Sequence, residues 1–523
     1  MLNHKIKQRK KFKNQRNNLL KQRKKFKNQR NNLLKQRKKR IFQRDFEKFF
    51  FVYIFATYKQ LNILIMKRII LSCVVLFLLN ILHINQSQAQ NWQNSLSVTL
   101  HTQFSTDAYA QKVKVYNNNY LVGITKKDGV DHYGFVLWHN TDNYKNIALL
   151  NTADIIINDF TLYYDDLFFC GQRLTSQGNY VGIIGHLNMN DFINNGNFQY
   201  EYADINTIKN LTKIIYYETT FGEKMLTAIG NDSPILSTFG QIVNLNFSNP
   251  NTIAYTVCPF YNLTHLEVLW DMFYCNDYVI TVSNVHLTNE YIIRYLKHDG
   301  QYLDNVDSYS FTFPGINFNL SSDPYHFPLH IADISQYAFA VCVSANDGQN
   351  FFTLINFHKK WSHYILSSQL HYHNDKDNKP LEMEYSSNFS RLLLLNDSYF
   401  SNMGKVQTMT YIDPFDTNSY NTLMENFNTP NQINHFSLIS PDHYAVAGTY
   451  SFSQSNNMQL FATKDINHPY LSCLDNSIVN IDPINTTPGN ICNPLLPYSL
   501  MSITWIIDNA NPNIENIIID CID

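Results

Sequence analysis

The chain has 523 residues, a formal net charge of -1, 44% hydrophobic residues and 14% aromatic residues. This composition excludes a generally disordered chain, and 17 Gly with 16 Pro exclude a collagen-like or linker-dominated one. The neutral total hides two oppositely charged parts, because residues 1–65 contain 21 basic and two acidic residues, whereas residues 90–523 contain 18 basic and 40 acidic residues.

The basic N-terminal segment, residues 1–65, contains a perfect repeat, in which Lys7–Leu20 is followed by the same sequence in Lys21–Leu34. Polybasic segments bind the phosphates of nucleic acids or tether proteins to anionic membranes. Folded repeats keep their apolar positions and diverge elsewhere, so perfect identity indicates a recent duplication of the underlying DNA. We therefore expect residues 1–65 to be a low-complexity extension that is not part of the mature protein.

The next segment, Met66–Ala89, has the order of a secretory signal peptide. Lys67 and Arg68 precede an apolar run over Ile69–Leu82, and the small-residue site Ser87-Gln88-Ala89 follows. The sequence therefore predicts a translation start at Met66, cleavage after Ala89, and a bacterial protein that is secreted or held at the cell surface. The alternative is a signal anchor, in which the apolar run stays in the membrane behind a basic cytosolic tail.

Residues from about 95 onward are typical of an all-β fold, because short runs of Val, Ile, Tyr, Phe and Thr alternate with clusters of Asn, Asp, Gly and Ser. One pattern recurs: a hydrophobic strand, an acidic or Asn turn, a second strand that opens with a large apolar residue, a polar loop and a third strand. The residues that open the second strand recur at a mean interval of about 54 residues. They are Tyr120, Leu167, Met225, Tyr278, Tyr337, Tyr399 and Tyr444.

This repeat length and strand pattern resemble a seven-bladed β-propeller of bacterial secreted proteins, although the chain carries no WD40, kelch or Asp-box signature that would name a family. The resemblance implies seven four-stranded blades over residues 90–470, closed by a donor strand at Ser95–Leu100. Tandem β-sandwiches are the alternative. Residues 471–523 are rich in Pro and contain three cysteines, which suits a cap, a small appended domain or a terminal sorting signal.

Cysteines of the predicted mature chain number seven, so at least one thiol is unpaired in an oxidising compartment. Cys170, Cys275 and Cys342 lie in apolar strand-like runs, where a free cysteine behaves as a small hydrophobe. The three C-terminal cysteines, Cys473, Cys492 and Cys521, are the better disulfide candidates, with no pairing assigned.

Motifs for catalysis, cofactors or metal ions are absent from the sequence, which has no GxSxG, HExxH, P-loop or GxGxxG. His371 and His373, with Asp375, would place two imidazoles on one strand face, but they lie in a polar stretch between units. Asp165-Asp166 and the pair Asp413 and Asp416 fall at predicted turns, where Asp forms local hydrogen bonds. We therefore name no catalytic residue, no cofactor and no metal ligand.

The function expected from these features is that of a secreted binding or interaction module for a protein or glycan ligand, working as a monomer. The net charge of -22 over residues 90–523 argues against nucleic acid. No membrane span is expected in the mature form. One alternative is a propeller enzyme, a glycan hydrolase or lyase, whose carboxylates converge in the central channel from different blades. Another is a structural component of a surface assembly.

Overall fold

The fold was analysed in a computed structural model of the chain. The chain divides into two compact units, residues 1–88 and 89–523, and every described residue lies in the second unit. The structure describes residues 98–521 except for these short gaps: 103–107, 117–119, 128–131, 140–144, 151–153, 195–198, 232–239, 248–249, 258–266, 286–287, 299–302, 314, 319–328, 349–350, 363, 373–377, 387–389, 401–403, 415–422, 428–430, 441–442, 454–455, 466–475, 479–480, 484–489, 492–498, 510 and 513–516.

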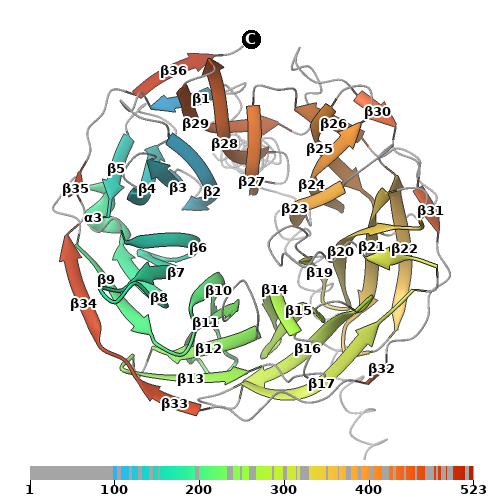
Figure 1. Cartoon of the computed structure of the whole chain (residues 1–523), viewed down its shortest axis with the longest axis horizontal. Coiled ribbons are helices and arrows are strands. Elements are labelled where there is room, and N and C mark those ends of the chain that lie inside the picture. Colours follow the sequence, from blue (N-terminus) through green and yellow to red (C-terminus); the bar gives the residue numbers. More distant parts are fainter. Residues whose placement is uncertain are drawn as a thin grey trace, which may run out of the picture. The chain divides into compact units, whose positions relative to one another are not determined.

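The described chain is almost entirely β-structure, and antiparallel sheets surround a central channel as the blades of a β-propeller (Figure 1). Seven innermost strands line the channel. They are β2 (Ala108–Tyr116), β6 (Ile155–Tyr163), β10 (Asn210–Glu218), β14 (Glu267–Cys275), β19 (His330–Ser335), β23 (Asn378–Ser386) and β27 (Asn431–Ser440).

Each inner strand pairs with a second strand through a short turn, and a third strand follows. The second strands are β3 (Tyr120–Lys127), β7 (Asp166–Leu174), β11 (Lys224–Asn231), β15 (Tyr278–Val285), β20 (Ala338–Asn346), β24 (Arg391–Phe400) and β28 (His443–Ser453). The third strands are β4 (His132–His139), β8 (Tyr180–Asn188), β12 (Gly240–Asn246), β16 (Tyr291–His298), β21 (Phe351–Lys359), β25 (Gly404–Ile412) and β29 (Asn456–Asp465).

Six blades have a fourth strand of their own. These strands are β5 (Lys145–Leu149), β9 (Gln199–Ile205), β13 (Thr252–Val257), β17 (Leu303–Phe311), β22 (Ile365–Tyr372) and β26 (Leu423–Phe427). An additional two-residue strand, β18 (Asn317–Phe318), pairs with β20, and the short helix α3 (Met189–Ile193) follows β8. No helix within the described ranges has the length and apolar character needed to cross a membrane.

The C-terminal segment supplies one further outer strand to each blade, and we name these strands the C-terminal belt. They pair in reverse chain order with β26, β22, β17, β13, β9, β5 and finally β1 (Val98–Thr102). The belt consists of β30 (Asn476–Ile478), β31 (Ile481–Pro483), β32 (Asn490–Ile491), β33 (Ser499–Ser502), β34 (Trp505–Asn509), β35 (Asn511–Pro512) and β36 (Ile517–Cys521). It covers sheet edges that would otherwise expose unpaired backbone groups.

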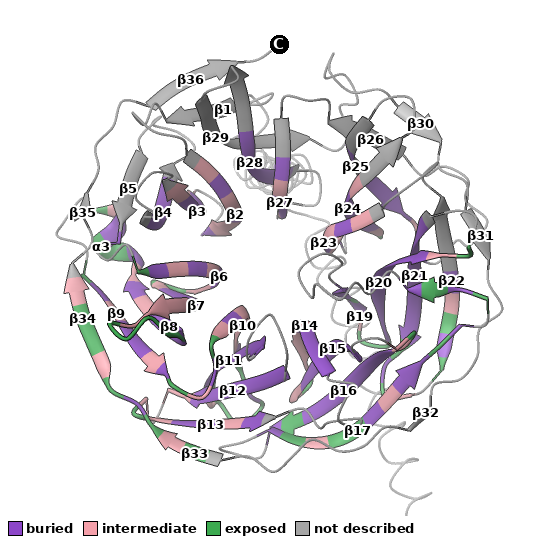
Figure 2. Cartoon of the chain, in the orientation of Figure 1, coloured by how far each residue is buried: buried purple, intermediate pink, exposed green. Residues whose placement is uncertain are grey.

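Hydrophobic clusters lie between successive blades and hold them together (Figure 2). Between the first two blades, the ring of Phe135 lies 5.9 Å from that of Phe160 and 5.6 Å from that of Phe169. Burying one such side chain stabilises the fold by about 1.5–3 kcal/mol. Because a blade is apolar on both faces, each sheet needs a neighbour on either side, which explains the closed ring.

The prediction of an all-β propeller is confirmed, but the prediction of seven four-stranded blades is wrong in its count of complete sheets. Six sheets have five or six strands, and the seventh repeat unit forms the three-stranded sheet β27–β29. The physical reason is that the first and last described strands, β1 and β36, meet there. Strand β1 lies beside β29 and pairs with β36, so the expected N-terminal donor stands at this position.

The sixth repeat unit was also read one strand out of register. The sequence pattern predicts that Tyr399 opens the second strand of this unit, with the run around Leu393 before it as the first strand. Both residues belong to one ten-residue strand, β24, and the inner strand is the preceding β23. The interrupting polar residues Asn396 and Asp397 gave the false signal of a turn.

Candidate functional site

The seven inner strands place one titratable residue each at a common level of the channel. Six of these residues pair with the fifth residue of the second strand of their blade, as Asp159 does with Cys170 and His330 with Cys342. The exception, Lys213, pairs with the sixth residue, Ile229. We name this set the channel ring. Its members are Lys112, Asp159, Lys213, Asp271, His330, Glu382 and His435.

A β-bulge precedes the channel ring residue in six of the seven inner strands. The register shifts follow Ala110, Ile157, Leu211, Leu269, Pro380 and Ile433. A bulge bends its strand and redirects the next side chain, which here turns a polar group toward the channel. The bulge also presses the inner strand against the second one: a Cβ on Gly171 would lie 1.9 Å from the Ile156 carbonyl oxygen, so only glycine fits there.

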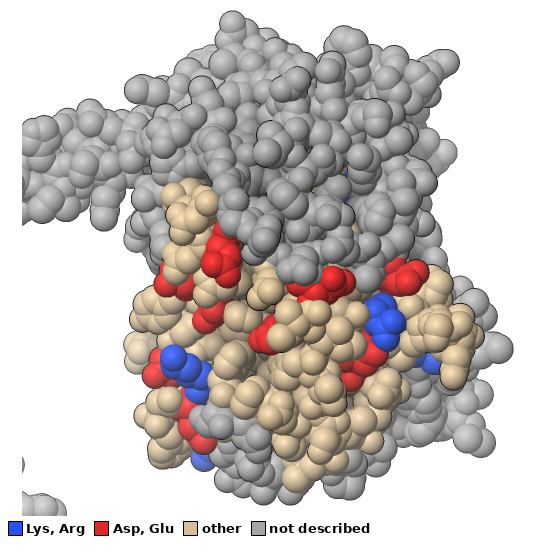
Figure 3. Space-filling model, turned by 90° about the vertical axis from the view of Figure 1, so that its left-hand side faces the viewer, with Lys and Arg blue, Asp and Glu red and all other residues tan. Residues whose placement is uncertain are grey.

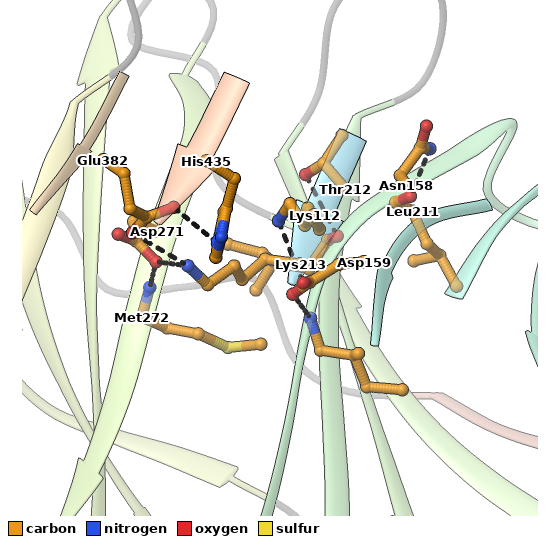
Figure 4. A network of polar contacts seen from close by, with 12 residues as sticks. Lys112, Asn158, Asp159, Leu211, Thr212, Lys213, Asp271, Met272, Glu382 and His435 are labelled. Carbon is orange, nitrogen blue, oxygen red and sulfur yellow. Dashed lines mark hydrogen bonds and ion pairs between the residues drawn. The ribbon is translucent and has the colours of Figure 1, made fainter. Parts of the chain in front are cut away.

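Ion pairs connect the channel ring, mostly between neighbouring blades and in one case, Lys213 with Glu382, between the third and the sixth blade (Figure 4). Lys112 Nζ lies 2.9 Å from Asp159 Oδ1, and Lys213 Nζ lies 3.0 Å from Asp271 Oδ1 and 4.0 Å from Glu382 Oε1. His435 Nε2 lies 3.1 Å from Glu382 Oε2. The ring therefore ties blades together by charge as well as by apolar packing.

Backbone groups fix two of these carboxylates. Asp159 Oδ2 accepts the Ile214 N–H at 2.9 Å across the boundary to the next blade. Asp271 accepts the N–H of Met272 at 2.8 Å and that of Ile331 at 3.2 Å. Both carboxylates are almost completely buried and keep fixed orientations.

Electrostatics keeps the ring carboxylates ionised. Burial alone would raise the pKa of Asp159, but Lys112, Lys114 and Lys213 outweigh it and hold that pKa well below its usual range. Burial likewise opposes the ionisation of Asp271 and Glu382, whereas Lys213 lowers the pKa of both, helped by His330 and His435 respectively. The ring thus presents fixed charges of both signs.

One carboxyl below the ring behaves differently. Burial, together with the charge of Glu382, raises the pKa of Glu384 to about 7. The nearby Lys114 has its pKa lowered, chiefly by burial. Both shifts favour the neutral form, so Glu384 and Lys114 are neutralised more easily than the carboxylates of the ring.

Two cavities lie along the channel and share Lys213, Asp271 and Glu382 as lining residues. The first has a volume of about 280 Å³ and is lined by residues at and before the bulges. The second, about 240 Å³, is lined by residues that follow the ring along the inner strands, such as Met272 and Glu384. Because the inner strands all run in the same direction, the ring separates the two cavities.

The first cavity combines one aromatic side chain with amides and charges. Its lining includes Trp270, Thr212, Lys112, Lys213 and the four amide side chains Asn158, Asn210, Asn231 and Asn434. Three amides also connect blades. Asn158 Nδ2 donates to the Leu211 carbonyl at 2.7 Å, Asn231 bonds both backbone groups of Leu269 at 3.1 Å, and Asn434 Nδ2 donates to the Ala110 carbonyl at 2.8 Å.

The residues weighed from the sequence lie outside this site. Asp165 lies in the predicted turn between β6 and β7, Asp166 is the first residue of β7, and Asp413 follows β25 as the partner of Arg391. The described part of the chain does not include residues 373–377, the side chain of His371 or Asp416. The hypothesis that His371 and His373 share one strand face is therefore not tested.

The cysteines follow the prediction where the structure describes them. Cys170, Cys275 and Cys342 are free, and Cys170 and Cys342 are buried among apolar residues. The side chains of Cys473, Cys492 and Cys521, the expected disulfide candidates, lie outside the described residues.

Sequence motifs missed the channel ring because each blade contributes only one of its members. A signal was nevertheless present. The apolar first strand of a unit opens with a charged residue or His at Lys112, Asp159, Lys213 and His435. Four such openings at equivalent places would have indicated an inward-facing polar position.

Together, the fold and the ring define a β-propeller protein with a charged, polar central channel. No family model matches the chain, and no curated protein matches it. Among solved structures, it is similar to the polysaccharide lyase Uly1, with 7% identity, a TM-score of 0.38 and coverage of 69% of this chain and 90% of that one. It is also similar to a protein of unknown function from Dyadobacter fermentans DSM 18053, with 7% identity, a TM-score of 0.39 and coverage of 71% and 99%. At 7% identity these similarities concern the fold alone.

Proposed function

We propose that the protein is a binding protein that takes a hydroxyl-rich ligand, a sugar unit of a glycan, into the 280 Å³ cavity of its channel. The lining of this cavity supports the proposal, because Trp270 offers an aromatic face and the surrounding amides and lysines offer hydrogen bonds. The volume of about 280 Å³ lies just below the range of about 300–1,000 Å³ that is usual for small-molecule pockets, which suits a ligand as small as one sugar unit.

The state of the carboxylates favours binding over glycoside hydrolysis. A retaining or inverting glycosidase needs one protonated carboxylic acid beside an ionised one. Ligand atoms of Asp271 and Glu382 lie within 4.8 Å of each other, but Lys213 approaches both and lowers the pKa of both. Neither is therefore poised to donate a proton, and Glu384, whose pKa is raised, lines the other cavity.

The exposed surface is consistent with a ligand that carries little negative charge. Acidic side chains are spread over the described part of one face and basic ones stand beside some of them (Figure 3). A polyanion would be repelled at long range by the net charge of residues 90–523. The expected glycan is accordingly neutral or weakly charged.

Trp270→Ala is expected to weaken glycan binding by about 30-fold, because truncating an aromatic anchor in a buried pocket costs about 2 kcal/mol. A glycan array with the full-length protein identifies a binder, and titration calorimetry measures both proteins against it. Trp361→Ala is the matched control, since Trp361 is exposed, its ring contacts that of Tyr278 at a tilted angle, and it lines neither of the two cavities.

Equal binding by the wild-type protein and Trp270→Ala would contradict the proposed site. Turnover of a glycan by the wild-type protein, lost in Glu382→Gln, would show an enzyme rather than a binding protein.

We also propose that Met66–Ala89 directs export. The order of charged, apolar and small residues in this segment supports the proposal. N-terminal sequencing of the protein from the culture medium is expected to begin at Gln90. A secreted form that retains the Lys-rich repeat would contradict it.

A further inference from the structure

His330 is a buried side chain whose polar atoms have no hydrogen-bond partner. The residue is 9% exposed, and neither Nδ1 nor Nε2 forms a hydrogen bond. Nδ1 lies 3.6 Å from Asp271 Oδ2, just beyond hydrogen-bonding distance. Buried polar atoms are nearly always paired, so an imidazole left in this state in a cavity wall points to a missing partner.

The neighbours of His330 identify the kind of partner. Asp271, His330 and Glu382 come from three successive blades, and all three are buried. One potential ligand atom from each lies within 4.8 Å of the others. We propose that these three side chains form a Zn²⁺ site at the floor of the 280 Å³ cavity.

The donor set selects this class of ion. Zn²⁺ binds imidazole nitrogen and carboxylate oxygen at about 2.0–2.2 Å, and a site with three protein ligands leaves one position open. Ca²⁺ and Mg²⁺ prefer sites made entirely of oxygen. The open position of the proposed site faces the cavity, because all three residues line it.

The surroundings of the carboxylates fit a shared role. Lys213 Nζ contacts Asp271 Oδ1, whereas His330 faces the other oxygen, Oδ2. His435 holds Glu382 by its Oε2 atom, and such an outer partner orients a ligating carboxylate. Lys213 is also a competing cation, because it lies near both carboxylates. Zn²⁺ therefore has to compete with the ammonium group of Lys213 for the two carboxylates of this site.

Zinc binding does not depend on the proposed glycan ligand and is tested with the metal alone. Titration calorimetry of the metal-free full-length protein with ZnCl₂ is expected to show binding that His330→Leu removes. His330 gives the fold no hydrogen bond, so this variant loses a ligand and keeps the backbone hydrogen bonds that fix Asp271. We expect a loss beyond the 10–100-fold that follows removal of an outer hydrogen-bonding partner, about 100-fold or more.

His298→Leu is the matched control, because His298 is a buried histidine whose Nδ1 lies 3.5 Å from Glu223, outside the cavity lining. Its zinc affinity is expected to equal that of the wild-type protein. Lys213→Met is expected to tighten zinc binding, because it removes the competing cation. A thermal shift on adding Zn²⁺ reports binding for any variant of reduced stability.

The proposal is overturned if the wild-type protein binds no Zn²⁺, if His330→Leu keeps the wild-type affinity, or if Ca²⁺ and Mg²⁺ bind as tightly as Zn²⁺. The result for glycan binding is separate, since Trp270→Ala leaves all three zinc ligands in place.

Discussion

Glu267→Gln is expected to lower the free energy of unfolding by about 3–5 kcal/mol, the usual cost of leaving a buried charge without its partner. Glu267 and Arg294 both have side chains that are 0% exposed. Arg294 Nε donates to Glu267 Oε1 at 2.8 Å, its Nη2 pairs with Oε2, and its Nη1 donates to Ser308 Oγ at 2.8 Å. The variant keeps the shape of the side chain and leaves a buried guanidinium uncompensated. Chemical denaturation followed by fluorescence measures the change.

Two comparisons test the reason for this loss. Arg391→Met removes an ion pair with Asp413 that is 39% and 22% exposed, and it is expected to cost less than about 1 kcal/mol. The double variant Glu267→Met and Arg294→Met removes both charges and is expected to be more stable than Glu267→Gln. A double variant less stable than Glu267→Gln would show that packing, rather than the unpaired charge, causes the loss.

Asp159→Asn is expected to cost a similar amount, about 3–5 kcal/mol at pH 7, because Asp159 is the buried counter-ion of the channel ring. Its side chain is 1% exposed, it pairs with Lys112 at 2.9 Å, and it accepts the Ile214 N–H. The charges of Lys114 and Lys213 also act on it. Without it, the ammonium groups repel one another across two blade boundaries. Denaturant unfolding at pH 7 measures the loss.

The same variant is expected to change the response to acid. The pKa of Asp159 is lower in the folded protein than in the unfolded chain, where it is about 3.9. The stabilisation that the ionised Asp159 contributes to the folded protein is therefore complete above the unfolded-chain pKa of about 3.9. It declines as the pH falls below that value. The difference in unfolding free energy between the wild-type protein and Asp159→Asn should shrink from pH 5 toward pH 2. Asp204→Asn is the control, because Asp204 pairs with Arg173 at partly exposed positions. A difference that stays constant over this range would contradict the lowered pKa.

The sequence predicted the propeller because every blade repeats the same apolar strands around the same turns. That pattern comes from side chains facing neighbouring sheets, as with Phe135 and Phe169. The sequence pattern did not predict strand β23, because Pro380, Glu382 and Glu384 interrupt its apolar residues. Glu382 and Glu384 line the channel cavities, so the residues of the candidate site concealed the strand that carries them.

The channel ring could be predicted only in part, because closeness across the channel depends on ring closure rather than on spacing along the chain. Asp271 and Glu382 are 111 positions apart and share one lysine. The belt could not be predicted at all. Strands such as β32 and β35 have two residues each and pair through backbone groups, so their side chains leave no periodic signal.

The belt also sets an order on biosynthesis. During translation the inner strands of the blades are synthesised first and the belt strands last. Each sheet therefore lacks its outermost strand until the C-terminal segment has been synthesised. Strand β30 reaches the sixth blade first, and β36 reaches β1, the first strand of the propeller, at the end. A premature stop at residue 475 would remove an edge strand from all blades at once rather than shorten one of them. Quality control that detects exposed sheet edges would thus recognise a chain that lacks the whole belt from any one of its blades.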